Sequence, residues 1–220
     1  MTKLLFRTAA TVILSLLLST SLFSAVMFPD PIVDTKNPAG AGKQTAVLAG
    51  GCFWCVEAVF QQIEGVEKVV SGYSGGDAAS AHYEIVSTGK TGQAESVQVT
   101  YDPQKISYGQ LLKVFFDVAH DPTQLNRQGP DTGPQYRSVI FYSNPEQKEI
   151  AEAYIKQLDQ AKVFRSPIVT QVAELKNFYP AEAHHQNFCR RNPMNPYVMG
   201  VAMPKVDKVK TKVPELAKKK

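Results

Sequence analysis

The chain has 220 residues and a mass of 24.2 kDa, with 44% hydrophobic, 10% aromatic and 20% charged residues. This composition excludes a disordered protein, a collagen-like fibre and a polytopic membrane protein, and the length allows one compact domain with its own core. The net charge of +4 comes from the two ends, because Lys3 and Arg7 lie near the start and seven lysines lie in the last sixteen residues. The body between them is mildly acidic, which gives no support for nucleic-acid binding.

The first 25 residues are typical of a secretory signal peptide. Lys3 and Arg7 precede an apolar run from Thr8 to Val26 that closes with small residues. The run is also close to the ~20 residues that span a bilayer, so an uncleaved membrane anchor is the alternative. Either reading predicts an exported protein, periplasmic or otherwise extracytoplasmic, with membrane contact only if the leader is kept. Residues 26–43 are rich in Pro and Gly and are predicted to be a linker.

Hydrophobic periodicity after this linker predicts alternating strands and helices. Strands are predicted at residues 45–49, 66–73, 95–101, 138–142 and 168–173, and helices from Cys52, at residues 108–120 and at residues 145–162. Residues 72–89 and 121–135 are predicted to be loops, and long loops in compact domains are usually functional. The order βαββαβ with additions predicts an α+β fold, a two-layer sandwich with a mixed sheet, a ferredoxin-like core and a long irregular C-terminal segment.

The folded domain is predicted to span residues 44–203, with residues 204–220 as a Lys-rich, solvated tail. The chain has three cysteines, Cys52, Cys55 and Cys189, and an odd number in an exported chain leaves at least one thiol free or in exchange. Cys52 follows two glycines at the predicted start of a helix, where unpaired amide groups and the helix dipole stabilise a thiolate. We therefore predict that Cys52 is a nucleophile, and Cys55 lies one helical turn away on the same side.

Two other readings of these cysteines stay open at this point. Cys52 and Cys55, together with His185 and Cys189, match the spacing of zinc ligands and could form a structural site in a binding module. Against this, the two residues between Cys52 and Cys55 are Phe and Trp, where metal knuckles need a tight turn. A thioredoxin-like disulfide oxidoreductase also places a C-x-x-C pair at a helix start.

The run Gly51-Cys52-Phe53-Trp54 resembles the active-site signature of the peptide methionine sulfoxide reductase A family. The resemblance continues in order along the chain and covers about residues 44–203. Its further matches are Gly72-Tyr73, Tyr83, residues 89–95, Val99 to Pro103, His120 to Thr123, Arg127 to Gly129, Asp131, Gln135 to Ser138, Ala181-Glu182 and His185-Gln186.

The resemblance implies an enzyme that reduces the S epimer of methionine sulfoxide, in proteins, peptides or free. It implies that Cys52 attacks the sulfoxide sulfur, which releases methionine and leaves a sulfenic acid. Phe53 and Trp54 would form the apolar pocket for the substrate methyl group. Glu95 would protonate the sulfoxide oxygen. The sequence supports this independently, because Glu95 alternates with Val97, Val99 and Tyr101 and so lies on the inward face of its strand. Burial there raises the pKa of a carboxyl group and keeps it protonated.

The same resemblance implies that Tyr83 and Tyr136 hydrogen-bond the sulfoxide oxygen as it gains charge. Asp131 would lie in the same site, on the long loop, and hold polar groups of the substrate or a water molecule. Tyr73, His120 and His185 also match family positions, and we expect structural roles for them.

Regeneration of Cys52 is where the sequence departs from many relatives. Position 55, often Gly in the family, is Cys here, and the C-terminal cysteine pair of many members is absent. We predict that Cys55 resolves the sulfenic acid as a disulfide, with Cys189 as the alternative. Either disulfide needs an external dithiol reductant of the thioredoxin type. No metal and no organic cofactor is implied, and we expect a monomer.

Overall fold

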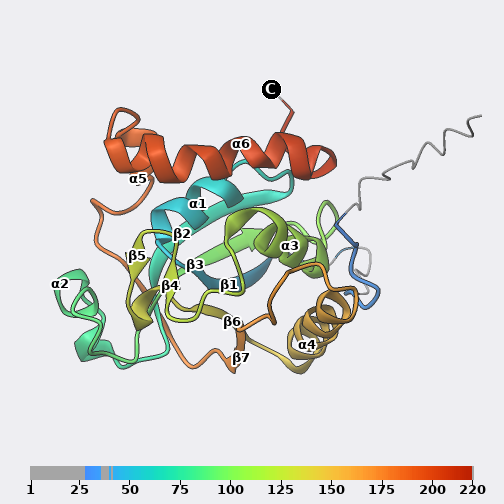
Figure 1. Ribbon diagram of the computed structural model, residues 1–220, viewed down its shortest axis with the longest axis horizontal. Coiled ribbons are helices and arrows are strands. Elements are labelled where there is room, and N and C mark those ends of the chain that lie inside the picture. Colours follow the sequence, from blue (N-terminus) through green and yellow to red (C-terminus); the bar gives the residue numbers. More distant parts are fainter. Residues whose placement is uncertain (1–27, 36–39, 41, 220) are drawn as a thin grey trace, which may run out of the picture.

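The computed structural model describes residues 28–35, 40 and 42–219 (Figure 1). The predicted leader, residues 1–25, lies outside the described residues. Within the described part of the chain, no helix is long and apolar enough to cross a membrane.

A six-stranded sheet in the order β7-β6-β1-β3-β2-β8 forms the centre of the molecule. Its strands are β1 (Gln44–Gly50), β2 (Val66–Ser74), β3 (Ala94–Tyr101), β6 (Ser138–Tyr142), β7 (Gln171–Glu174) and β8 (Phe178–Pro180). The four inner strands, β6-β1-β3-β2, pair antiparallel with one another. This order confirms the predicted α+β fold with a ferredoxin-like core, to which β7 adds a parallel strand at one edge and β8 an antiparallel strand at the other.

Three helices cover one face of this sheet: α1 (Phe53–Phe60), α3 (Tyr108–Val114) and α4 (Pro145–Gln160). Local sequence explains where two of them begin. Ser107 caps α3 in a capping box with Gln110, and the Asn144 side chain caps α4 just before a proline in its first turn. The main core lies between these helices and the sheet and includes Leu48, Val97, Val99, Phe60, Leu111, Phe115 and Tyr154, each at most 1% exposed.

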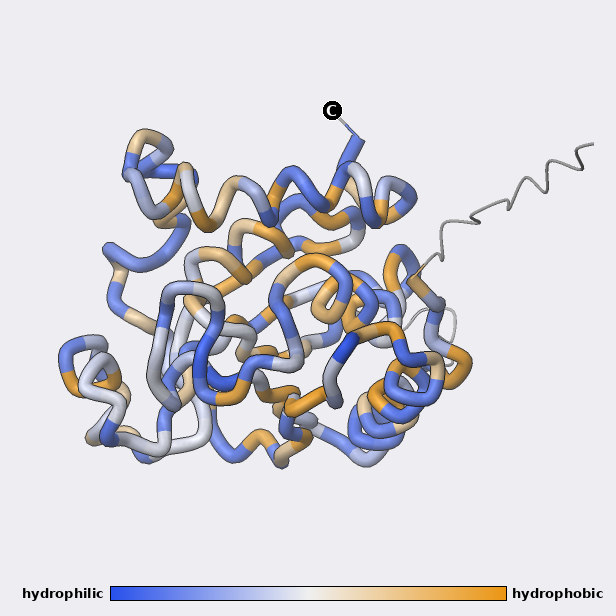
Figure 2. Tube along the Cα trace, in the orientation of Figure 1, coloured by the Kyte–Doolittle hydropathy of each residue, from blue (hydrophilic) through white to orange (hydrophobic). Residues whose placement is uncertain are grey.

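The prediction of a solvated tail after residue 203 is wrong. Helix α6 (Met203–Lys212) packs along α1 on the side away from the sheet (Figure 1). Val209, Val213 and Leu216 are buried in the main core. These apolar residues recur every three to four positions between exposed lysines, so the segment alternates along its length between hydrophobic and hydrophilic residues (Figure 2). The prediction rested on the high lysine content and overlooked this spacing of the apolar residues, which is typical of an amphipathic helix.

Replacing Val213 by Ala is expected to lower the free energy of unfolding by about 2 kcal/mol, because the side chain is fully buried and its removal leaves a cavity. Urea unfolding followed by circular dichroism measures the change. Lys210→Ala, at an exposed position of the same segment, is the control and should change stability by less than about 0.5 kcal/mol. Equal effects of the two substitutions would contradict the packing described here.

The described part of the predicted linker, residues 28–35, also packs against the domain. The Tyr154 hydroxyl donates a hydrogen bond to the carbonyl oxygen of Pro29 at 2.7 Å, and Lys113 pairs with Asp30 at 2.8 Å. Asp34 accepts hydrogen bonds from the Gly109 amide and the Ser107 hydroxyl at the start of α3. The segment forms no helix or strand, as predicted, yet it is docked on α3 and α4.

Candidate active site

Helix α1 begins next to Cys52, and a tight turn places the thiol there. Gly51 has φ +89°, and a Cβ at this position would fall 2.5 Å from the Gln128 side chain. Cys52 is the N-cap residue, and its carbonyl oxygen accepts hydrogen bonds from the amides of Cys55 and Val56. The glycine therefore allows the chain to leave β1 and present Cys52 at the positive end of the helix dipole.

A cavity of about 210 Å³ lies against the Cys52 side chain. Seven of its eight lining residues are site residues predicted from sequence: Cys52, Phe53, Trp54, Tyr83, Glu95, Asp131 and Tyr136. They come from α1, from β3, from the short helix α2 (Tyr83–Val86), from the strand β5 (Asp131–Thr132) and from the 3-10 turn Pro134–Tyr136. The hairpin β4 (Arg127–Gln128) and β5, within the long loop predicted at residues 121–135, brings Asp131 to the cavity.

Glu95 is 2% exposed and shares the helix-covered face of β3 with Val97, Val99 and Tyr101. Its Oε2 accepts a hydrogen bond of 3.0 Å from the Phe53 amide at the start of α1. Burial raises the pKa of Glu95 to about 8, and the hydrogen bond from Phe53 opposes that rise in part. At neutral pH this carboxyl group therefore carries a proton next to the cavity.

Cys52, the N-cap residue of α1, and Cys55, in the first turn of this helix, form a hydrogen-bonded pair. Burial is the main cause that raises the pKa of Cys52 above its ordinary value, and its hydrogen bond with Cys55 adds to this rise. The Cys52 thiol donates to Cys55, and this hydrogen bond lowers the pKa of Cys55. We expected the helix start to hold Cys52 as the thiolate. The structure instead favours the charge on Cys55, because the hydrogen bond from Cys52 stabilises a thiolate there and outweighs the burial of Cys55.

Cys189 lies behind this pair and outside the cavity. It is buried in one cluster with Cys52, Cys55, Val198 and Ala202. Its thiol lies 3.4 Å from the carbonyl oxygen of Trp54, and burial raises the pKa of Cys189 to about 12. Cys189 is thus close to both other cysteines, but Cys55 is the one hydrogen-bonded to Cys52.

Aromatic rings build the wall of the cavity. The Trp54 indole stacks on Phe188 with the ring centroids 3.7 Å apart and an angle of 8° between the planes. Its Nε1–H donates to His185 Nδ1 at 3.2 Å, and His185 also packs against Tyr83 with centroids 4.2 Å apart. His185 therefore supports the wall from outside the cavity, which is the structural role expected for it.

The other two residues expected to be structural also lie outside the cavity. The Tyr73 hydroxyl donates to Glu182 at 2.9 Å, and the second oxygen of Glu182 accepts from the Tyr83 amide at 2.9 Å. Glu182 therefore connects Tyr83 at the start of α2 to Tyr73 near the end of β2. His120 is buried between the Phe115 carbonyl oxygen and the Ser138 hydroxyl, and burial lowers its pKa to about 3.

Tyr197 is the cavity residue that sequence reasoning missed. Its hydroxyl donates to Asp131 Oδ2 at 2.5 Å, and the Cys55 thiol lies 3.8 Å from the same hydroxyl. Tyr197 follows Asn195-Pro196 in an aperiodic stretch, so no local pattern marks it. It reaches the site because residues 188–216 fold back over α1.

A zinc site is not assembled by the predicted ligands. Among the described residues, no group of three or more His, Cys, Asp and Glu side chains is placed to hold a metal ion. Of the four candidate ligands, His185 faces Trp54 and Cys189 faces the Trp54 carbonyl oxygen.

Comparison with known proteins finds relatives along nearly the whole described chain. A family model described as peptide methionine sulfoxide reductase matches residues 44–217, a range that includes α6. The chain is 56% identical over 182 residues to peptide methionine sulfoxide reductase MsrA 2 of Mesorhizobium japonicum. The matched region covers 83% of this chain and 93% of the relative. It is 53% identical over 191 residues to MsrA 2 of Synechocystis sp., covering 86% and 88%.

Solved structures with this fold include Mxr1 of Saccharomyces cerevisiae in reduced form, with a TM-score of 0.62 and 32% identity over 74% of this chain and 92% of that one. Methionine sulfoxide reductase A of Corynebacterium diphtheriae has a TM-score of 0.62 and 35% identity, covering 71% and 78%.

Proposed function

The chain belongs to the peptide methionine sulfoxide reductase family and reduces methionine sulfoxide with thiols. We propose that Cys52 is the nucleophile of this reaction and that the S epimer is the substrate. The observation that carries the proposal is the placement of the Cys52 thiol and the protonated Glu95 carboxyl group on one small cavity with an aromatic wall. A nucleophile and an acid on the same cavity are what reduction of a sulfoxide requires.

In the first step, Cys52 attacks the sulfoxide sulfur. Cys55, whose pKa the hydrogen bond from Cys52 lowers, takes up the Cys52 thiol proton when it is in its thiolate form. The Glu95 proton passes to the sulfoxide oxygen, which leaves the substrate and remains on Cys52 as a sulfenic acid, and methionine is released. Glu95 is left as a carboxylate and takes a proton back from water, because its pKa of about 8 lies above neutral pH.

The remaining cavity residues act on the substrate in the same step. Tyr83 and Tyr136 both line the cavity, and their hydroxyl groups stabilise the oxygen by hydrogen bonding as it gains negative charge. Asp131 is held by Tyr197 and positions polar atoms of the substrate or a water molecule. Phe53 and Trp54 receive the methyl group on an apolar surface.

In the second step, Cys55 resolves the sulfenic acid. Its thiol attacks the Cys52 sulfur, the hydroxyl group leaves as water with the Cys55 proton, and a disulfide between the two cysteines forms. The hydrogen bond between the two thiols supports Cys55 in this role. Cys189 is the alternative, since it lies in the same buried cluster.

A disulfide must be reduced before the next turnover, and we propose an external dithiol of the thioredoxin type as the reductant, with no metal or organic cofactor. Oxidised proteins and peptides would be the substrates, alongside the free amino acid. We also propose that the enzyme is a monomer. The predicted leader supports an exported enzyme, and N-terminal sequencing of the protein from its native host would show whether the leader is removed.

A thiol count tests both steps. Reduced wild-type protein mixed with methionine sulfoxide, without any reductant, is expected to lose two thiols for each methionine formed. Cys55→Ser is expected to lose one thiol and to hold a sulfenic acid that dimedone traps, and Cys189→Ser is expected to behave like wild type. If Cys55→Ser still loses two thiols and Cys189→Ser accumulates the sulfenic acid, Cys189 is the resolving residue.

A further inference from the structure

Glu57 is a buried acidic residue that the proposed reaction does not use. It lies in α1, one turn after Trp54, and is 1% exposed. No lysine or arginine of the described chain forms an ion pair with it. A buried carboxyl group without a cation is costly unless it is well hydrogen-bonded, so its contacts indicate why it is there.

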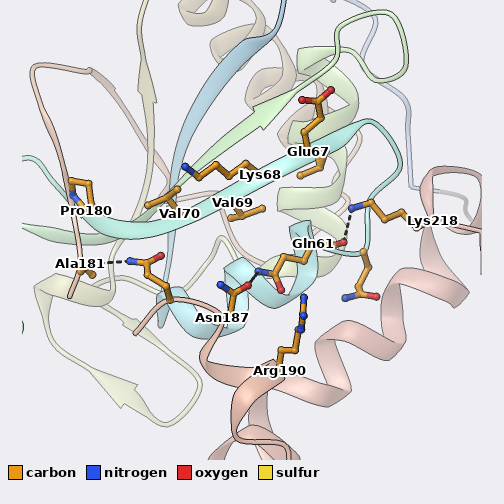
Figure 3. A pocket seen from close by; sticks show the side chains of 13 residues that line it. Gln61, Glu67, Lys68, Val69, Val70, Pro180, Ala181, Asn187, Arg190 and Lys218 are labelled. Carbon is orange, nitrogen blue, oxygen red and sulfur yellow. Dashed lines mark hydrogen bonds between the residues drawn. The ribbon is translucent and has the colours of Figure 1, made fainter. Parts of the chain in front are cut away.

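Those contacts are two backbone amides at the start of α5 (Phe188–Arg191). Glu57 Oε1 accepts a hydrogen bond of 3.0 Å from the Asn187 amide, and the Phe188 amide donates to the same carboxyl group. Asn187 itself has φ +54°, in the left-handed region. Just after the end of α1, Gln61 Nε2 donates to Asn187 Oδ1 at 2.9 Å, and both residues line a groove of about 560 Å³ (Figure 3).

The segment held in this way contacts Trp54 twice. The Phe188 ring stacks on the indole, and the Cys189 thiol lies 3.4 Å from the Trp54 carbonyl oxygen. Trp54 therefore lies between the cavity on one side and Phe188 on the other. If the start of α5 moves, the support behind the cavity wall moves with it.

We infer that Glu57 is a positioning residue of the substrate pocket: by binding the amides of Asn187 and Phe188, it fixes Phe188 against Trp54. The inference rests on the proposed role of Trp54 in binding the substrate methyl group. It assigns Glu57 no contact with the substrate, so its effect should fall on binding and not on the chemical step.

The arrangement also makes pocket binding depend on pH. Burial raises the pKa of Glu57 to about 7, while the two amides and Arg191 of α5 lower it in part. Cys189 of α5 is the other titratable group coupled to it, and its pKa of about 12 keeps that thiol neutral. Hydrogen bonds to a carboxylate are stronger than those to a neutral carboxyl group. The start of α5 is therefore held more tightly above pH 7 and less tightly below it.

Trp54 is the only tryptophan of the chain, so its fluorescence reports on this contact directly. The experiment compares wild type, Glu57→Gln and Glu57→Ala, all reduced, between pH 5.5 and pH 9. Wild-type emission should change with a midpoint near the Glu57 pKa of about 7, and this step should be missing in E57Q. Glu95 and His185 also titrate near Trp54, but they are the same in both proteins, so the difference isolates Glu57.

Kinetics with free methionine sulfoxide complete the test. E57A is expected to raise KM by about fivefold and to leave kcat within about twofold, because it removes support for ground-state binding. E57Q keeps a carbonyl oxygen that accepts from the two amides, so its KM should stay within about twofold of the wild-type value. In wild type, KM should decrease between pH 6 and pH 8 as Glu57 ionises, and this decrease should be absent from E57Q. Glu64→Ala, at an exposed position just beyond α1, is the matched control and should resemble wild type throughout.

Two results would overturn the inference: E57A with wild-type emission and KM, or E57Q as impaired as E57A. Circular dichroism shows whether each variant is folded, and E57Q carries the test if E57A is not. Absence of turnover in wild type would refute the proposed function, and the fluorescence comparison would still decide whether Glu57 holds Phe188 against Trp54.

Discussion

Cys52→Ser is expected to reduce turnover of methionine sulfoxide by about 10⁴-fold or more. The hydroxyl of serine is a far weaker nucleophile than a thiol and cannot form a sulfenic acid. The substitution replaces a buried side chain by one of similar shape, so the fold should be kept. Methionine formation in excess dithiothreitol measures the effect, because this reagent removes the need for a resolving cysteine.

Cys55→Ser and Cys189→Ser are the matched controls under these conditions. Both are expected to retain turnover, since dithiothreitol reduces the Cys52 sulfenic acid directly. If Cys55 can donate electrons to the sulfoxide without Cys52, the C52S variant will retain turnover, and the assignment of the nucleophile will have to move to Cys55.

Glu95→Gln is expected to lower kcat by about 10²–10⁴-fold, the range that a positioned general acid supplies. The amide oxygen can still accept the hydrogen bond from the Phe53 amide, so the start of α1 should be undisturbed, but the side chain no longer has a proton to give. In wild type, the protonated form of Glu95 prevails below its pKa of about 8. The rate should therefore fall as the pH rises above about 8, and this alkaline fall should be absent from E95Q.

The raised pKa of Glu95 has a second consequence that must be measured alongside the rate. Its pKa is higher in the folded protein than in the unfolded chain, so its contribution to stability is present at low pH and is lost as the pH rises through about 8. Thermal unfolding at each pH separates a loss of folded protein from a loss of the acid. An alkaline fall at the same pH in E95Q would contradict the role of Glu95 as the acid.

Local patterns predicted most of the fold, because strands and helices with one buried face have distinct periods. The alternation of Glu95, Val97, Val99 and Tyr101 predicts a carboxyl group on the inner face of β3, and the four side chains are buried. The glycines before Cys52 likewise indicated a turn into a helix, which the positive φ of Gly51 confirms.

The C-terminal segment shows where local patterns fall short. Its apolar positions have a helical period, but the many lysines concealed it, and only α1 provides the surface on which α6 becomes stable. Tyr197 had no signal of its own. It lines the cavity because the segment that follows Asn187 folds back over α1, a contact between residues more than a hundred positions apart.

The family could be predicted from motifs in order along residues 44–203. The position of Cys52 at a helix start and the inward side of Glu95 followed from neighbours within a few residues. Contacts between distant segments were needed to show which cysteine has the lowered pKa, that Tyr197 holds Asp131, and that Glu57 binds the amides behind Trp54. Burial and hydrogen bonds from distant segments set the free energy of a charge, and no local pattern in the sequence shows them.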